Sequence, residues 1–456
     1  MSIVMKFGGT SVADAAALEN VAGIVAEQRD AAPVVVVSAM SGVTDALLGS
    51  ARLATERSVD EAIASLSETF TRHRFAAQQL LSREPANAFV GDLNDAAAKI
   101  SELLRRASDE PQRAKAMHDA IVSFGELLSS RLLAILLNQR GVNARQVDPR
   151  DCIVTNDEYT CAAPLMNETF ARTRRSLLPL IEEHVVPVVG GFVGATAGGT
   201  TTTLGRGGSD YTAAIIGAAL RCDEIQIWTD VTGVLTADPR VVRDAQTVER
   251  LSYSEAAELA YFGAKVLHPK TIQPAIEDRI PVRICNSRQP QQRGTLVSPQ
   301  EQTSEAAVRT VKAIAHKTGV TIVQITSARM LGAYGFLRAL FEVFERHRTV
   351  VDVVTTSEVS VSLSLDDDRS LPAIVRELEQ LGTVRIEHGR AIICVVGEGL
   401  RGTPGIAARA FSTITDINVT LISQGASSIN FTFAIEEARV AEAVNRLHEV
   451  FFPNVQ

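Results

Sequence analysis

The run Lys6-Phe-Gly-Gly9 follows the apolar residues 3–5 and precedes the Ala-rich stretch 13–26. The apolar residues predict a short buried strand, and apolar positions near helical spacing in 13–26 predict a helix capped by Thr10 and Ser11. A glycine turn between a strand and a helix N-terminus binds anionic oxygens, because its N–H groups point outward and the helix dipole favours negative charge. Lys6 would add a positive charge beside a phosphate. The run therefore predicts a phosphate site, although an ordinary strand–turn–helix corner explains these residues about as well.

A second glycine-rich run, Leu204-Gly-Arg-Gly-Gly-Ser-Asp210, follows a buried strand that ends at residues 190–192. Its glycines allow close approach of a ligand, and Arg206 can bind a carboxylate through two parallel hydrogen bonds. Ser209 and Asp210 are predicted to cap a helix that begins near Tyr211. The alternative is a flexible turn followed by an ordinary helix cap. Two such runs in one chain disfavour that alternative.

Other polar positions have ordinary structural explanations. Ser38 and Thr44 follow a strand, where they could line a substrate site or cap the next helix. Glu126 is a single carboxylate in an apolar helix, and such a residue is usually just exposed. The segments 228–233 and 238–240 also fit a turn with an Asx cap.

Length and composition restrict the class of protein. At 456 residues the chain has room for about three domains. Hydrophobic residues make up 46% and charged residues 21%, as in soluble globular proteins. The net charge of −8 argues against a nucleic-acid partner. The five dispersed cysteines suit free thiols in a reducing cytoplasm, and the longest apolar runs are strand-sized, so no membrane or export segment is expected.

The distribution of Val and Ile predicts a doubly wound α/β domain of mostly parallel strands over residues 1–297. Residues 51–140 are helical throughout and predict an insertion between early strands. The polar stretch 290–305 predicts a linker, placed at residues 298–310. Expected buried strands are residues 33–38, 185–193, 224–229 and 280–285.

Beyond the linker the chain repeats itself. Gly332–Gly335 and Gly402–Gly405 each open an apolar helix that is followed by two strands. Each copy is a ferredoxin-like unit too small to bury a large core alone. The pair resembles two ACT modules, at residues 311–385 and 386–456. In the pattern that it resembles, one module is nested in the other, which would assign the first strand, near residues 311–316, to the second copy.

Together these motifs resemble the aspartokinases of the amino acid kinase family, over essentially the whole chain. The resemblance implies ATP-dependent phosphorylation of the β-carboxylate of L-aspartate to 4-phospho-L-aspartate, the first step of lysine, threonine and methionine biosynthesis. It implies Mg²⁺ bound to the nucleotide, and a cytoplasmic homodimer or homotetramer assembled through the ACT modules. The attacking carboxylate is already ionised at neutral pH, so no general base is needed, and positioning and electrostatics carry the catalysis.

The resemblance also assigns residues. It gives catalytic roles to Lys6, Asp210 and Lys265, although a lysine near a helix end is often only a dipole partner. Leu235 stands where relatives often carry tyrosine, which leaves nucleotide stacking open at that point. The implied nucleotide contacts are Lys6, Gly8, Gly9, Thr229, Asp230, Leu235, Asp238, Arg240, Lys265 and Val266. The implied aspartate contacts are Ser38, Thr44, Glu126, Arg206, Gly207, Gly208 and Ser209, with Glu126 binding the α-amino group. No side chain is assigned to a metal.

Feedback inhibition by lysine through the first ACT-like copy is also expected. Asp352 and Glu358 supply negative charge, whereas the second copy has Thr420 and Ala426 at the corresponding places. A solvated acidic pair at a strand start is the alternative. Residues 333 and 334 depart from the lysine-sensitive pattern, so threonine or a combination of effectors stays open. The residues that resemble an effector pocket are Met330, Val350, Val351, Asp352, Thr356, Ser357 and Glu358.

Two other functions remain. One is a different amino-acid kinase that acts on glutamate, carbamate or uridylate, and the paired ACT-like modules and Phe-Gly-Glu126 argue against it. The other is a catalytically decayed amino-acid sensor, which the intact Lys6, Arg206, Asp210 and Lys265 argue against.

Overall fold

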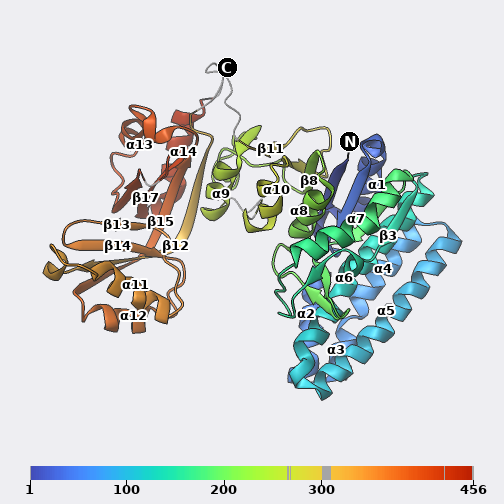
Figure 1. Cartoon of the computed structure of the whole chain (residues 1–456). Helices are drawn as coiled ribbons and strands as arrows, with labels where there is room; N and C mark the ends of the chain where they lie inside the picture. Colours follow the sequence, from blue (N-terminus) through green and yellow to red (C-terminus); the bar gives the residue numbers. More distant parts are fainter. Residues whose placement is uncertain (1, 264–266, 268, 300–309, 426, 454–456) are drawn as a thin grey trace. The chain divides into compact units, whose positions relative to one another are not determined.

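The computed structural model describes residues 2–263, 267, 269–299, 310–425 and 427–453. Its internal contacts divide the chain into two compact units, residues 1–234 with 266–300 and residues 235–265 with 301–456 (Figure 1). The described residues 235–263, which the sequence predicted in the first domain, therefore belong to the second unit. Lys265, Val266 and most of the linker predicted at 298–310 lie outside the described residues.

The first unit contains one large sheet, a small sheet and the helices that cover them. The strands of the large sheet are β1 (Ile3–Phe7), β2 (Pro33–Val37), β3 (Ala144–Val147), β5 (Val186–Gly190), β8 (Glu224–Thr229), β10 (Val282–Asn286) and β11 (Thr295–Ser298). The small sheet has β4 (Val154–Thr155), β6 (Val193–Thr196) and β7 (Thr201–Thr203). The α-helices are α1 (Ala15–Glu27), α2 (Val43–Glu56), α3 (Val59–Ser65), α4 (Ser67–Leu80), α5 (Arg83–Asp109), α6 (Ala114–Gln139), α7 (Met166–Glu182), α8 (Gly208–Leu220) and α10 (Gln273–Glu277). Short 3-10 turns are η1 (Gly9–Val12), η2 (Arg29–Ala31), η3 (Pro111–Arg113), η4 (Pro149–Asp151) and η5 (Pro269–Ile272).

Within the first unit, the strands of the large sheet follow the order β3-β5-β2-β1-β8-β10-β11. Neighbouring strands are parallel except for β11, which runs antiparallel to β10. The predicted doubly wound, mostly parallel α/β fold is confirmed. The chain between β2 and β3 forms helices α2 to α6, which are drawn in blue to cyan in Figure 1. Part of the polar stretch predicted as a linker instead forms β11, because Leu296 and Val297 pair with β10.

Both faces of the sheet are buried, as the continuous Val and Ile runs predict. Ile3, Met5 and Phe7 point to one face and pack in a core with apolar residues of α1 and α6. Val4 and Val36, on the opposite face, are fully buried as well. The Phe7 and Trp228 rings stack with centroids 5.9 Å apart, which ties β1 to β8.

Helix α6, with the 3-10 turn before it, is the one helix in the described part of the chain long and apolar enough to cross a membrane. The test uses length and composition only, and 72% of the apolar window is buried inside the protein. The long apolar stretch of α6 is explained here by its place in the core of the first unit.

The second unit contains a six-stranded antiparallel sheet in the order β13-β14-β12-β15-β17-β16. Its strands are β12 (Ala313–Thr326), β13 (Val354–Thr356), β14 (Ser360–Leu365), β15 (Thr383–Val396), β16 (Leu421–Gln424) and β17 (Asn430–Glu436). Its helices are α11 (Phe336–Arg346), α12 (Leu371–Leu378), α13 (Ile406–Thr413) and α14 (Val440–Phe451), with 3-10 turns η6 (Ala328–Met330), η7 (Leu400–Gly402) and η8 (Glu437–Arg439). The segment before residue 264 adds β9 (Arg250–Ser252) and α9 (Tyr253–Tyr261).

The long strands β12 and β15 run through both repeated modules. Residues 313–317 of β12 pair with residues 392–396 of β15, beside β17 and the core formed with α13 and α14. Residues 320–326 pair with residues 383–390, in the module whose core includes α11 and α12. The first half of β12 thus packs in the second module.

The segment 235–249 is fixed to the second module by buried contacts. Ala237 and Val242 belong to the same apolar core as α14. The Thr236 hydroxyl is 2.8 Å from Nε2 of His448, and the Asn445 amide donates to the Val241 carbonyl at 3.1 Å. These contacts join residues far apart in the sequence. The local composition, which assigned the segment to the α/β domain, could therefore not reveal them.

The predicted cap of the first helix is wrong. The carboxylate of Asp14 accepts a hydrogen bond from the Ala17 N–H at 2.9 Å and caps α1. Thr10 and Ser11 lie in the 3-10 turn η1, and the Ser11 hydroxyl is hydrogen-bonded to that of Ser287 at 2.8 Å. The tertiary contact, rather than helix capping, fixes Ser11.

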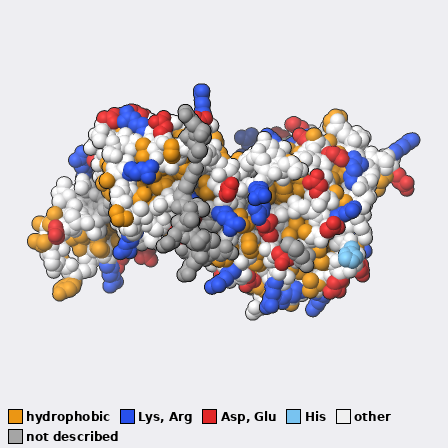
Figure 2. All heavy atoms as spheres, turned by 90° about the horizontal axis from the view of Figure 1, so that it is seen from above, with side chains coloured by type: hydrophobic (Ala, Val, Ile, Leu, Met, Phe, Trp, Pro, Cys, Tyr) orange, Lys and Arg blue, Asp and Glu red, His pale blue; other side chains and the backbone are white. Residues whose placement is uncertain are grey.

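The surface agrees with the composition. Figure 2 shows one face of the molecule, on which basic and acidic side chains are interspersed instead of gathering by sign. In the described residues all five cysteines are free thiols.

Replacing the buried Asp119 by Ala should lower the free energy of unfolding of the first unit by about 3 kcal/mol. Its carboxylate accepts hydrogen bonds from the N–H groups of Thr160 (2.9 Å) and Thr203 (3.0 Å) and from the Thr203 hydroxyl (2.9 Å), so Asp119→Ala leaves these donors unpaired. Urea denaturation followed by Trp228 fluorescence measures the change. The exposed Asp157→Ala is the matched control, and equal stability of the two variants would contradict this role.

Candidate functional site

A cavity of about 550 Å³ lies in the first unit where β1, β2, β5 and β8 end. Because these strands are parallel, the loops that follow them meet at one edge of the sheet. The chain passes from β1 to β2 on one side, whereas β8 lies on the other, and ligands of such sheets bind in the crevice at this switch point. The cavity is lined by Lys6, Gly8, Gly9, Thr10, residues 38–42, Thr44, Asp45, Glu126, Phe192, residues 205–210, Thr229 and Asp230.

The cavity gathers residues predicted from distant parts of the sequence. Every residue predicted to contact the substrate lines it, and so do Lys6 and Asp210 of the predicted catalytic set. Of the predicted nucleotide contacts, Lys6, Gly8, Gly9, Thr229 and Asp230 line it too.

Lys6 and Asp210 form an ion pair inside the cavity. The Lys6 ammonium is 2.5 Å from Oδ1 of Asp210, and the two side chains are only 12% and 18% exposed. Strand β1 presents Lys6 at its end, and the turn after it is held by a hydrogen bond from the Gly8 N–H to the Trp228 carbonyl at 3.1 Å. Asp210 therefore fixes the position of a positive charge where the chain leaves the sheet.

Ser209 and Asp210 do not cap α8, as the sequence had predicted, but lie within its first turn. The helix begins at Gly208, and Gly207 is the N-cap with φ +77°. A left-handed backbone at this point favours glycine. The helix N-terminus is thus part of the cavity wall, where its dipole favours an anion.

Glu126 is the buried carboxyl group of the cavity. Its residue is 3% exposed, and its Oε2 atom has no hydrogen-bond partner in the described part of the structure. Two glycines allow the helix of Glu126 to pack closely against its neighbours. A Cβ added to Gly190 would lie 3.2 Å from the Cβ of Glu126, and a Cβ added to Gly125 would lie only 2.8 Å from the Cβ of Ala39. Burial raises the pKa of Glu126 to about 8, opposed by the Ala39 backbone N–H. A cation that binds here would return the carboxyl group to its ionised form.

Arg206 lies exposed in the loop between β7 and α8. No ion pair within the described ranges involves its guanidinium group, which can therefore bind an added carboxylate. The cavity thus combines groups for anions, namely Lys6, Arg206 and the N-terminus of α8, with a buried acceptor for a cation. This combination suits a ligand that carries both an ammonium and a carboxylate group, beside a phosphate.

Three predicted nucleotide residues, Leu235, Asp238 and Arg240, belong to the second unit. Asp238 accepts hydrogen bonds from the backbone N–H and the side chain of Arg240, which holds the pKa of Asp238 below its usual value. The chain has one other Asp-Pro-Arg sequence, which lies in the first unit. There Asp148 and Arg150 make the same turn. The turn is thus a property of this local sequence, and a nucleotide role for these residues stays a prediction.

Sequence reasoning missed Arg72. From α4 its guanidinium donates to the carbonyl of Ser41 at 2.9 Å and to that of Ala13 at 3.2 Å. It joins the loop after β2, which lines the cavity, to the chain that follows η1. No local pattern marks an arginine of the helical insertion for this role, because both partners are backbone atoms distant in sequence.

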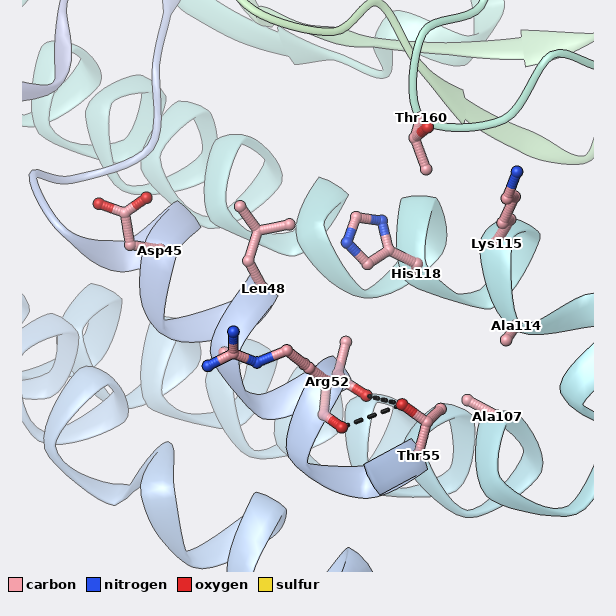
Figure 3. A pocket seen from close by; sticks show the side chains of 11 residues that line it. Asp45, Leu48, Arg52, Thr55, Ala107, Ala114, Lys115, His118 and Thr160 are labelled. Carbon is pink, nitrogen blue, oxygen red and sulfur yellow. Dashed lines mark hydrogen bonds between the residues drawn. The ribbon is translucent and has the colours of Figure 1, made fainter. Parts of the chain in front are cut away.

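A second cavity, of about 580 Å³, adjoins the first through Asp45, which lines both. Helices α2, α5 and α6 form it, and Figure 3 shows Arg52, Lys115 and His118 around it. Thr55 directs its hydroxyl to carbonyls of its own helix, as the dashed lines mark.

The predicted effector residues lie in the first module of the second unit. Met330 ends η6, Thr356 ends β13, and Ser357 and Glu358 form the turn before β14. Val350 and Val351 directly precede Asp352, whose side chain is only 4% exposed.

Comparison with known proteins agrees with this architecture. The amino acid kinase family model matches residues 1–286, and the ACT domain model matches residues 393–451. The chain is 39% identical to aspartokinase 1, chloroplastic, of Arabidopsis thaliana, over 99% of this chain and 80% of that protein. It is 36% identical to lysine-sensitive aspartokinase 3 of Escherichia coli (strain K12), over 99% of both chains.

Two structures of the E. coli aspartokinase III are also similar. The complex with aspartate and ADP gives a TM-score of 0.82 at 35% identity, covering 99% of this chain and 100% of that one. The complex with lysine and aspartate gives 0.82 at 36% identity, covering 99% of both.

Arg72→Gln should make the amide hydrogens of residues 41–44 exchange about tenfold faster, because the variant loses the bonds that join two loops. Hydrogen–deuterium exchange with mass spectrometry measures this. Arg74→Gln, on the same helix but with an exposed partner, is the control. Unchanged exchange in Arg72→Gln would show that Arg72 does not hold the loop.

Proposed function

This chain belongs to the aspartokinase family, and from that premise we propose that it transfers the γ-phosphoryl group of ATP to the β-carboxylate of L-aspartate. The product is the acyl phosphate 4-phospho-L-aspartate, which opens the biosynthesis of lysine, threonine and methionine. The observation that carries the proposal is the cavity that unites Lys6, Asp210, Glu126 and Arg206. A similar E. coli structure, described as a complex with aspartate and ADP, supports the substrates.

Each wall of the cavity has a role in the proposed reaction. Arg206, with residues 207–209, binds carboxylate, Glu126 binds the α-amino group, and Ser38 and Thr44 line the same pocket. Lys6, held by Asp210, stabilises the negative charge of the transferring phosphoryl group. Because the β-carboxylate of aspartate is ionised at neutral pH, it attacks without a general base.

The nucleotide phosphates would lie against Gly8, Gly9 and Lys6, with Thr229 and Asp230 at the neighbouring strand end. Lys265, Val266, Leu235, Asp238 and Arg240 complete the proposed nucleotide set. No group of three His, Cys, Asp or Glu side chains that could hold a metal ion occurs in the described part of the chain. Mg²⁺ would enter with ATP, since this ion is usually held by phosphates, waters and one or two carboxylates. When bound, it neutralises phosphate charge.

Regulation is the other part of the proposal. Residues 1–297 would form the catalytic domain, and the modules at 311–385 and 386–456 would regulate it and assemble a cytoplasmic homodimer or homotetramer. Lysine is the proposed inhibitor, bound at Met330, residues 350–352 and residues 356–358. The name of the lysine-sensitive E. coli relative supports this effector.

An ADP-coupled assay with aspartate and glutamate side by side tests the reaction. We expect turnover with aspartate, little with glutamate, and a fall in kcat of about 10³-fold in Lys6→Met, because the lost charge acts mainly in the transition state. Lys115→Met, an exposed lysine of α6, is the control. Preference for glutamate would favour another amino-acid kinase, and no turnover with either substrate would favour a sensor.

The affinity for aspartate should rise with pH. With a pKa of about 8, Glu126 is mostly protonated at pH 6.5, whereas binding an ammonium group favours its ionised form. The proton must then leave on binding, so the KM for aspartate should fall by up to about tenfold per pH unit between pH 6.5 and 8 and level off above.

Glu126→Gln should raise this KM and flatten its pH profile, because the variant has no proton to lose. Glu102→Gln, on the exposed side of α5, should keep the wild-type profile. A wild-type KM that is independent of pH would contradict the role of Glu126.

A further inference from the structure

The second unit contains a cluster of two carboxylates, one ammonium and one phenol, of which only Asp352 has a proposed role. The hydroxyl of Tyr261 donates to Oδ1 of Asp352, and the ammonium of Lys317 is 3.3 Å from Oδ2 of the same carboxylate. Lys317 also forms an ion pair with Asp366 and lies 4.8 Å from the centre of the Tyr261 ring. Asp352 is thus engaged on both of its oxygens.

The charges of this cluster do not balance. Asp352 and Asp366 carry two negative charges when ionised, and Lys317 supplies one positive charge. Burial, together with the neighbouring Asp352, raises the pKa of Asp366, as expected for two carboxylates that share one cation. Glu258 adds a further negative charge near Tyr261. One more cation would therefore be favourable here.

The phenol connects the cluster to a segment with a different predicted role. Tyr261 is the last residue of α9, and Phe262, Gly263 and one further residue separate it from Lys265 in the chain. Gly263, with φ +122°, packs so closely on β12 that an added Cβ would lie 2.4 Å from the carbonyl oxygen of His316, the neighbour of Lys317. The end of α9 is therefore held against β12 at two adjacent points.

We propose that Tyr261, Lys317 and Asp366 are effector-responsive residues, through which a cationic amino acid at Asp352 acts on the C-terminal end of α9, which precedes Lys265 in the chain by four residues. The ammonium group of the effector takes the Asp352 oxygen that the Tyr261 hydroxyl holds. Its positive charge balances the excess negative charge of the cluster. Loss of the hydrogen bond between Tyr261 and Asp352 then releases the end of α9. This inference rests on the proposed inhibition by lysine, whose predicted site includes Asp352.

The same charge balance distinguishes between effectors. An amino acid with a neutral side chain brings one ammonium and one carboxylate, so its net charge is zero. Lysine brings a second ammonium and a net positive charge, which is what the cluster lacks. The cluster thus favours lysine over threonine without any contact to the rest of the side chain.

Lysine binding to Asp366→Asn, measured by titration calorimetry on the full chain, tests the charge argument. We expect the dissociation constant to rise about tenfold, because the cluster loses the negative charge that attracts a second cation. Asp367→Asn is the matched control, since this exposed neighbour pairs with Arg369 and not with the cluster. Equal dissociation constants in the two variants would overturn the inference.

Tyr261→Phe tests the connection, because the variant keeps the ring and loses the competing hydroxyl. We expect lysine to bind at least as tightly as to wild type, while maximal inhibition, relative to each protein's own rate without lysine, falls at least severalfold. Tyr159→Phe, at a partly buried tyrosine of the first unit outside the effector residues, is the control. Wild-type inhibition in Tyr261→Phe would overturn this inference but leave the proposed regulation standing. Absence of lysine binding to wild type would overturn both.

Discussion

The ion pair between Lys6 and Asp210 is the interaction on which the site depends. A lysine that is almost buried needs a nearby counter-charge, and Asp210 supplies it at 2.5 Å from the first turn of α8. The pair joins the end of β1 to the helix that follows the second glycine-rich run. Two glycine-rich turns that lie about two hundred residues apart in the sequence are thereby held on either side of one cavity.

The other walls of the cavity carry groups for anions and a group for a cation at different places. Arg206 and the N-terminus of α8 attract anions, whereas Glu126 is a carboxyl group that burial keeps protonated until a cation arrives. This separation orients a zwitterionic substrate. The preorganised positive charge near Lys6 then acts where the negative charge of a phosphoryl group develops, and such electrostatic stabilisation is usually the largest part of catalysis.

Much of this could be read from the sequence, where local rules decide the outcome. Strand β8 was predicted at its observed bounds, and the strand that begins at Pro33 was predicted one residue too long. Both predictions succeeded because continuous β-branched runs mark buried parallel strands. Both glycine-rich runs line the cavity as expected. Capping predictions failed at Ser11 and Ser209, where a tertiary contact and a glycine N-cap decided the structure.

What the sequence could not supply are contacts between distant elements. Arg72 holds a cavity loop through backbone carbonyls, which leave no trace in sequence patterns. The packing of residues 235–249 on α14, and the contact of Tyr261 with Asp352, depend likewise on the tertiary fold. Both features place a segment with predicted nucleotide contacts in the same unit as the predicted effector residues, which is where coupling between the two would have to arise.

Trapping the acyl phosphate shows directly whether the protein phosphorylates the β-carboxylate of aspartate. Incubation of the protein with ATP, Mg²⁺ and L-aspartate in the presence of hydroxylamine converts an acyl phosphate to a hydroxamate, which can be quantified by mass spectrometry. We expect aspartyl β-hydroxamate in an amount equal to the ADP released. Release of ADP and inorganic phosphate without hydroxamate would contradict the proposed reaction, because the cavity would then not direct the β-carboxylate to the phosphoryl group.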